Sequence, residues 1–223
     1  MRKLNRPLPA PPALSTYDHN VHKWSNKKPS KACRNLIWNR FRTMQGKFCA
    51  LCERATDQRN GHIEHYFHKG GKPGQAALYK HLMFSWDNLF GCCGLTSSNT
   101  CGHFKDRQGS EGPGAYNASE LIKPDVDDPR IFFDFLETGV IEPKPGLSTQ
   151  DLKRASETIR VLNLSALNGA RKKQIDIFKK ELNELEALSH EMNVQELHKI
   201  MNTIKTKVKQ QEYQTAVLEA LFN

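Results

Sequence analysis

The sequence of 223 residues contains no long hydrophobic run. A helix that crosses a membrane needs ~20 consecutive apolar residues, and no stretch approaches that length. The first twenty residues, MRKLNRPLPAPPALSTYDHN, start with basic residues but contain no apolar segment of the kind found in secretory signals. These two absences predict a protein without a membrane span and with a cytoplasmic location.

Acidic residues are almost missing from the first fifth of the chain. Residues 1–47 contain 11 Lys and Arg but a single acid, Asp18. Residues 48–150 carry a net charge of −3 and residues 151–223 one of +2, so the excess behind the formal charge of +9 lies at the N-terminal end. A local positive excess of this kind favours a polyanionic partner, with nucleic acid first.

Regular structure is not expected over residues 1–29, because proline removes a backbone donor and favours extended chain. The sequence here predicts a basic arm that becomes ordered on binding. From residue 30 to residue 47, the apolar side chains recur at helical spacing. They are Leu36, Ile37, Phe41 and Met44. The other face carries Arg34, Arg40 and Arg42, which are candidates for nucleic-acid contact, although an ordinary solvated face fits them about equally well.

Cysteine is scarce outside one window, since five of the six cysteines lie between Cys49 and Cys101. In a reducing cytosol such clustering favours a metal site over disulfides. Cys49 and Cys52 form a CxxC knuckle, which brings two thiolates to one tetrahedral ion. Cys101 and either Cys92 or Cys93 are the candidates that close the site. A structural zinc is therefore favoured over a redox-active pair or free buried thiols.

The rest of the chain predicts an α+β fold that is mostly α. Residues 48–108 are rich in loops, with a short strand at 62–67 and a short helix at 75–83. Residues 109–146 are rich in Gly, Pro and Asp, which predicts an extended wrapping segment without regular structure. Residues 147–223 read as three or so helices packed in a bundle, with cap signals at Ser148 and Asn193.

Three short motifs lie in and after the cysteine window. They are Ile63-Glu64-His65, Trp86-Asp87-Asn88-Leu89 and, after Cys101, Gly102-His103-Phe104-Lys105. The order CxxC, (Asp/Glu)-His, Asn-Leu, Cys…Cys, His resembles that of the HNH endonucleases, whose ββα-metal fold places the catalytic histidine on a strand and the last histidine on a helix. The stretches MRKLNRP, WDNLFGCC, CGHFKD, LIKPDVDDPRIFFDF and TIRVLNL make the chain similar to the PtuB-type HNH proteins of Septu and retron-associated antiphage systems.

The resemblance implies a zinc-stabilised ββα-metal core over residues 48–108. It implies that His65 is the general base, and that Glu64 and His103 hold a catalytic Mg²⁺ or Mn²⁺. It implies that Asn88 fixes the loop that orients His65. Lys105, beside His103, is a candidate phosphate contact.

The resemblance also implies a structural zinc ligand set, in which Cys93 is preferred to Cys92 because it falls five residues after Asn88. The set is Cys49, Cys52, Cys93 and Cys101. Two features depart from the pattern: Glu64 replaces the commoner Asp, and seven residues separate the last two cysteines, where many relatives have two.

The expected function is that of a metal-dependent HNH endonuclease that cleaves nucleic acid, DNA first. The resemblance implies that it acts as the effector of an antiphage system, in a hetero-oligomer with a PtuA-like ATPase. One alternative is a retron effector that cleaves RNA such as tRNA. Another is a zinc-stabilised nucleic-acid-binding module without catalysis. His62 and His68 are expected to be bystanders, either of them at most a loose metal contact, and His81 a surface residue.

Overall fold

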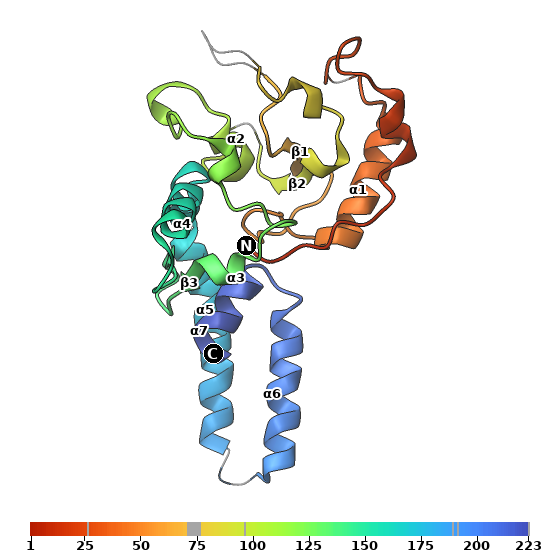
Figure 1. The fold of residues 1–223 in the computed structure, drawn as a ribbon. Helices are drawn as coiled ribbons and strands as arrows, with labels where there is room; N and C mark the ends of the chain where they lie inside the picture. Colours follow the sequence, from red (N-terminus) through yellow and green to blue (C-terminus); the bar gives the residue numbers. More distant parts are fainter. Residues whose placement is uncertain (26, 71–76, 96, 189, 191, 223) are drawn as a thin grey trace.

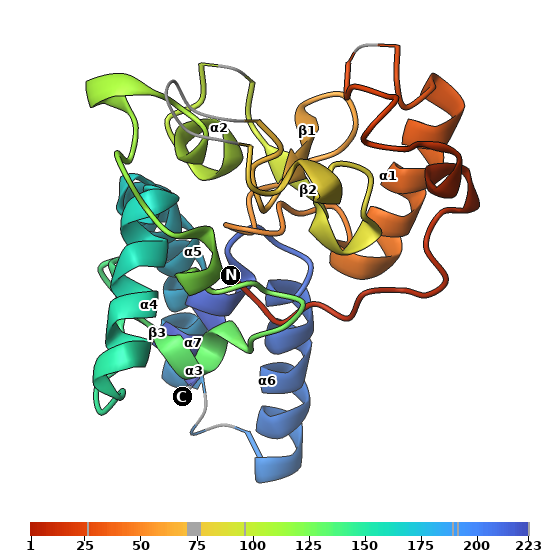
Figure 2. The same cartoon turned by 45° about the horizontal axis from the view of Figure 1, so that its top comes forward.

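A computed structural model describes residues 1–25, 27–70, 77–95, 97–188, 190 and 192–222. The fold is α+β, with two separate two-stranded antiparallel sheets and helices around them (Figures 1 and 2). Within these ranges, no helix combines the length and the apolar character needed to cross a bilayer.

Helix α1 spans Lys31–Gln45, as its apolar spacing predicts. The Ser30 side chain caps it by accepting a hydrogen bond from the backbone N–H of Cys33 at 3.2 Å, and Gly46, with φ of 65°, ends it. Its buried face includes Ile37 and Phe41, whereas Leu36 is 45% exposed, so the predicted apolar face was wrong at that position. Leu36 lies one residue, or about 100° of helix rotation, away from the centre of the buried stripe.

The central layer consists of two strands and a short helix. Strand β1 (Gly61–His65) pairs antiparallel with β2 (Leu89–Cys93), in a register that sets His65 opposite Leu89. Helix α2 (Cys101–Lys105) follows and packs against β2. The predicted strand at 62–67 is therefore present, while the helix predicted at 75–83 lies partly outside the described residues. Its described part forms a single 3₁₀ turn, Lys80–Leu82.

The N-terminal segment is not a free arm, which corrects the expectation from its prolines and charge. Met1, Leu4 and Leu14 are buried in the main core, and the Leu4 backbone N–H donates to the carbonyl of Pro124. The Arg6 guanidinium lies 2.6 Å from the Asp125 carboxylate and stacks over the rings of Trp86 and Phe90. Burial of apolar side chains at intervals between the prolines holds this segment in place.

Residues 109–146 contain regular structure, which also corrects the sequence prediction. A turn of helix, α3 (Pro129–Phe132), leads into a hairpin of β3 (Phe133–Phe135) and β4 (Ile141–Pro143). The hairpin buries one side of the alternating FDF and IEP patterns. Its turn requires Gly139, whose φ is 79° and where an added Cβ would lie 2.2 Å from the carbonyl oxygen of Asn168.

The C-terminal region is helical but does not form one bundle. The helices are α4 (Thr149–Val161), α5 (Asn168–Leu188), α6 (Val194–Val208) and α7 (Gln214–Phe222). The predicted caps are confirmed: Ser148 accepts from the backbone N–H of Asp151, and Asn193 forms a capping box with Glu196. Helix α4 packs into the main core, whereas α5, α6 and α7 surround a second core that contains Ile175 and Phe178. In Figure 1, α5 and α6 project together away from the sheet layer.

Truncation of Leu4 tests whether the N-terminal segment belongs to the core. Leu4 is 2% exposed, so we expect Leu4→Ala to lower the free energy of unfolding by about 2–5 kcal/mol. Leu8, four residues on, is 78% exposed, and Leu8→Ala should change stability by less than about 0.5 kcal/mol. Denaturant unfolding of both variants measures the difference. Equal stability of the two would show that the segment is a free arm after all.

Candidate functional site

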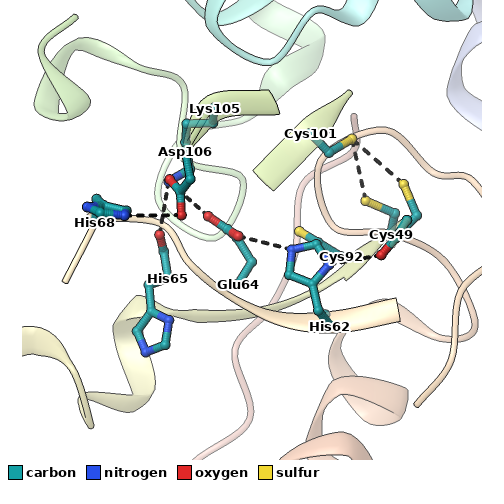
Figure 3. Close-up of polar contacts among 12 residues, drawn as sticks. Cys49, His62, Glu64, His65, His68, Cys92, Cys101, Lys105 and Asp106 are labelled. Atoms are coloured by element: carbon teal, nitrogen blue, oxygen red, sulfur yellow. Dashed lines mark hydrogen bonds and ion pairs between the residues drawn. The ribbon is translucent and has the colours of Figure 1, made fainter. Parts of the chain in front are cut away.

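Four buried cysteines converge at the base of the central layer. The Sγ atoms of Cys49, Cys52, Cys93 and Cys101 all lie within 4.8 Å of one another. Individual sulfur–sulfur distances are 3.9 Å for Cys49–Cys101, 3.5 Å for Cys52–Cys93 and 3.9 Å for Cys93–Cys101. Sulfurs bound to one tetrahedral zinc at ~2.3 Å lie about 3.8 Å apart, so this cluster could hold such an ion. Cys92 is buried beside His62 rather than in the cluster (Figure 3).

The backbone around each pair of thiols directs them inward. In the knuckle, the N–H of Glu53 donates to the carbonyl of Cys49, and the N–H of Cys49 donates to the carbonyl of Arg54. Cys93 is the last residue of β2, and Cys101 is the first of α2. The N–H of Cys101 donates to the carbonyl of Leu162 at 2.9 Å, which joins the cluster to the end of α4.

A buried carboxylate lies on the other side of His62 from the cluster. Glu64 is 3% exposed, and its Oε1 lies 2.9 Å from Nζ of Lys105. That oxygen receives no well-directed hydrogen bond from any residue that the structure describes. Burial alone would raise the pKa of Glu64, but the charge of Lys105 and the hydrogen bond from His62 hold it well below its usual range. Glu64 therefore stays ionised and paired with Lys105.

His62 and His103 lie next to this carboxylate. His62 Nε2 is 3.1 Å from Glu64 Oε2, and the ring centroids of the two histidines are 3.9 Å apart. Gly102 makes the approach of α2 possible, because a Cβ there would lie 2.0 Å from Glu64 Oε2. One carboxylate and two imidazoles are donor types that a divalent transition metal accepts, but in this structure both ring nitrogens of His62 face acceptors, Glu64 Oε2 and the carbonyl of Gly94. The sequence analysis predicts His62 to be a bystander. Residues i and i+2 of a strand share a face, and this is the signal that places His62 beside Glu64.

Asn88 holds the segment that follows β1. It is 1% exposed and lies directly before β2. Its side-chain oxygen accepts from the N–H of Phe67 at 2.6 Å, and its side-chain nitrogen donates to the carbonyls of Phe67 and Leu82. These three hydrogen bonds hold Phe67 and Leu82, two residues of the connection between β1 and β2, next to Asn88.

His65 is turned away from the Glu64 carboxylate (Figure 3) and is only 2% exposed. Its Nε2 lies 3.0 Å from the carbonyl of Met83, so Nε2 carries the proton and Nδ1 carries the lone pair. Lys69 Nζ lies 3.3 Å from Nδ1, and the ring of Trp24 meets the His65 ring edge-on at 4.4 Å. Burial, followed by the charge of Lys69, lowers the pKa of His65 to about 3, so the ring is neutral at physiological pH.

Lys105 is not a surface contact for phosphate, which corrects the sequence expectation. Its side chain is 0% exposed and lies between Glu64, Asp106 and the carbonyl of His65. Burial would lower its pKa, but the two carboxylates raise it above the ordinary lysine value. Lys105 therefore stays charged and stabilises Glu64 internally. No sequence signal identifies Asp106 as its second partner.

The three arginines of α1 differ in their surroundings. Arg34 donates to the backbone carbonyls of Ser25, Lys28 and Pro29, so it closes the turn before the helix. It also lines a cavity of about 280 Å³ that reaches His62. Arg40 is half-buried and Arg42 is exposed. Only Arg34 of the three therefore lines that cavity beside the candidate site.

No protein-family model matches the chain, and no curated protein matches it either.

Replacing one cysteine of the Cys92–Cys93 pair at a time tests the cluster. We expect Cys93→Ala to lose stoichiometric zinc, because a tetrahedral structural site needs all four ligands. Cys92→Ala should retain zinc, since its sulfur lies outside the four-thiol group. Elemental analysis of both purified variants measures the content. Loss of zinc in Cys92→Ala, with zinc retained in Cys93→Ala, would instead assign the fourth ligand to Cys92.

Removing the Lys105 charge tests the buried ion pair. Lys105→Met leaves Glu64 without its cation, which should cost about 3–5 kcal/mol of stability. Adding Glu64→Gln removes the unpaired charge and should recover most of that loss. The matched control is Lys172→Met, whose pair with Asp176 is half exposed and should contribute less than about 0.5 kcal/mol. Denaturant unfolding of the four proteins gives these values, and equal losses in the single and double variants at Lys105 would contradict the pairing.

Proposed function

We propose that this protein is a metal-dependent nuclease that hydrolyses phosphodiester bonds in nucleic acid, with DNA as the first candidate substrate. The observation that carries the proposal is the placement of three motifs on one strand–strand–helix unit. Glu64 and His65 end β1, Asn88 precedes β2, and His103 lies on α2, with a four-thiol cluster beneath them. The same residues, in the same order, make the sequence resemble the HNH endonucleases.

The donor set at this unit supports the proposal. Glu64, His103 and the neighbouring His62 would hold the divalent cation, and the two imidazoles favour Mn²⁺ over Mg²⁺. A cation bound there would neutralise negative charge on the scissile phosphate. Because Gly102 has no Cβ, α2 and its His103 can lie close to Glu64 Oε2. Lys105 would keep the carboxylate ionised and in place.

His65 is neutral, as a general base must be, but a pKa of about 3 makes it a weak base in this buried conformation. The Met83 carbonyl holds the proton on Nε2, so Nδ1, which faces Lys69 Nζ at 3.3 Å, is the nitrogen that would accept a proton from water. In this conformation Lys69 and Trp24 cover the ring. Activity therefore requires the ring to become accessible, by movement of these two side chains or of the segment that carries Met83.

One alternative is supported by a specific observation. A zinc-stabilised binding module without catalysis is consistent with a histidine that is 2% exposed and turned away from the carboxylate. An RNA substrate and a PtuA-like ATPase partner rest on the resemblance alone. The assay below therefore includes DNA, RNA and such an ATPase.

Replacement of His65 tests the proposed chemistry. We expect the wild-type chain, with or without a PtuA-like ATPase, to cleave plasmid DNA when Mn²⁺ or Mg²⁺ is supplied. His65→Ala should lower the rate about 10²–10⁴-fold, the usual contribution of a general base. His81→Ala is the control, since His81 is exposed in the segment before β2. Total RNA serves as the second substrate, and zinc content should be the same in all three proteins.

Equal cleavage rates in His65→Ala and wild type would remove His65 from the mechanism. Binding of nucleic acid by the wild type, with no cleavage of DNA or RNA under any of these conditions, would favour the non-catalytic module.

A further inference from the structure

A second cavity, of about 410 Å³, lies between the central layer and the segment that follows α2. One wall is formed by Tyr66, Phe67 and Leu82 from the connection between β1 and β2. The opposite wall contains Ala118, Leu121 and Val126 from a distant part of the chain. A cavity of this size with mostly apolar walls is within the range of small-ligand sites. Asp87 and Asn88 of the second motif also line it, but no role discussed above uses the space itself.

One end of the cavity is polar. The Tyr66 hydroxyl is buried in a residue that is 1% exposed, and it has no hydrogen-bond partner among the described residues. A tyrosine hydroxyl keeps its proton at physiological pH and can donate it. An unpartnered buried hydroxyl costs about 1–3 kcal/mol unless something else satisfies it.

The charges at this end cancel. Lys123 Nζ lies 2.6 Å from Asp125, and Arg154 lies 2.9 Å from Asp127. Arg6 also pairs with Asp125, and Asp87 lines the cavity, so three cations and three carboxylates leave no net charge to attract a phosphate or to repel a neutral ligand. The Lys123 backbone N–H and Arg154 both bind Oδ2 of Asp127. This polar end of the cavity therefore suits a neutral chemical group that carries hydrogen-bond donors and acceptors along one edge.

We propose that this cavity binds a nucleobase. A base is planar, has apolar faces that stack on aromatic side chains, and carries donors and acceptors on its edge. Phe67 supplies the aromatic surface, and the Tyr66 hydroxyl and Asp127 supply the polar edge. The base comes either from a free nucleoside or nucleotide or from a strand unstacked on the protein, and the second source rests on the proposed nuclease function.

Nucleoside binding by the full chain tests the proposal without any cleavage. Adenosine, guanosine, cytidine and thymidine are titrated separately, and ¹H–¹⁵N correlation spectra follow the amides of Phe67, Ser119 and Val126. We expect at least one nucleoside to shift these amides in a saturable way. Absence of saturable shifts with all four nucleosides would overturn the proposal.

Two variants with a matched control locate the site. Tyr66→Phe removes only the hydroxyl, so it should weaken nucleoside binding about five- to tenfold while leaving stability unchanged or higher. Val126→Trp, at a rim position that is 67% exposed, should block the cavity and abolish binding. Val194→Trp, equally exposed at the start of α6, should bind as wild type does. Unchanged binding in both cavity variants would place the nucleoside elsewhere and refute the proposal.

A single-stranded oligonucleotide that contains 2-aminopurine separates the two sources of the base. If a strand supplies it, 2-aminopurine fluorescence should be quenched on binding, and Val126→Trp should remove the quenching. If the site takes free nucleosides only, the amide shifts persist while the oligonucleotide shows no Val126-dependent quenching. Either result supports the cavity as a nucleobase site, and neither depends on phosphodiester hydrolysis.

Discussion

The convergence of four thiols is the constraint on which the rest of the structure depends. Cys49 and Cys52 follow α1, Cys93 ends β2, and Cys101 begins α2, so one small cluster joins three elements. The knuckle also reaches the C-terminal region, because the Glu53 carboxylate accepts from the N–H and the hydroxyl of Thr215 near the start of α7. A metal ion in the cluster would thus stabilise both halves of the chain, since its binding free energy would add to that of folding.

Charge balance inside the central layer is the second constraint. Glu64 could not remain ionised at 3% exposure without Lys105, and Lys105 could not remain charged without Glu64 and Asp106. The three residues come from β1, α2 and the residue after α2, so the ion cluster also fixes how the helix sits on the strand. A divalent cation beside Glu64 would therefore join an existing arrangement of charges rather than neutralise an isolated carboxylate.

Local sequence patterns correctly predicted the features that depend on residues close together in the sequence. The Ser148 and Asn193 caps and α1 follow from spacing alone, because each interaction spans a few residues. The CxxC knuckle also follows from spacing, whereas the preference for Cys93 over Cys92 came from the resemblance. The predictions that failed concern contacts between residues far apart in the sequence. The pairing of Arg6 with Asp125 joins residues 119 positions apart, and it turns an apparently free basic segment into part of the core. Lys105 was misread for the same reason, since its partner Glu64 lies 41 positions earlier and no local pattern marks the side chain as buried.

The connection between β1 and β2 joins His65, the candidate general base, to the proposed nucleobase cavity. Met83 and Leu82 are adjacent: the carbonyl of the first fixes the His65 tautomer, and the side chain of the second lines the cavity. Asn88 holds Leu82 and Phe67 together through its side-chain amide. A nucleobase bound against Phe67 and Leu82 would therefore contact the same segment of backbone that holds His65 in its buried orientation. If occupancy shifts that orientation, thermodynamic linkage requires that exposure of His65 change the affinity for the base by the same factor.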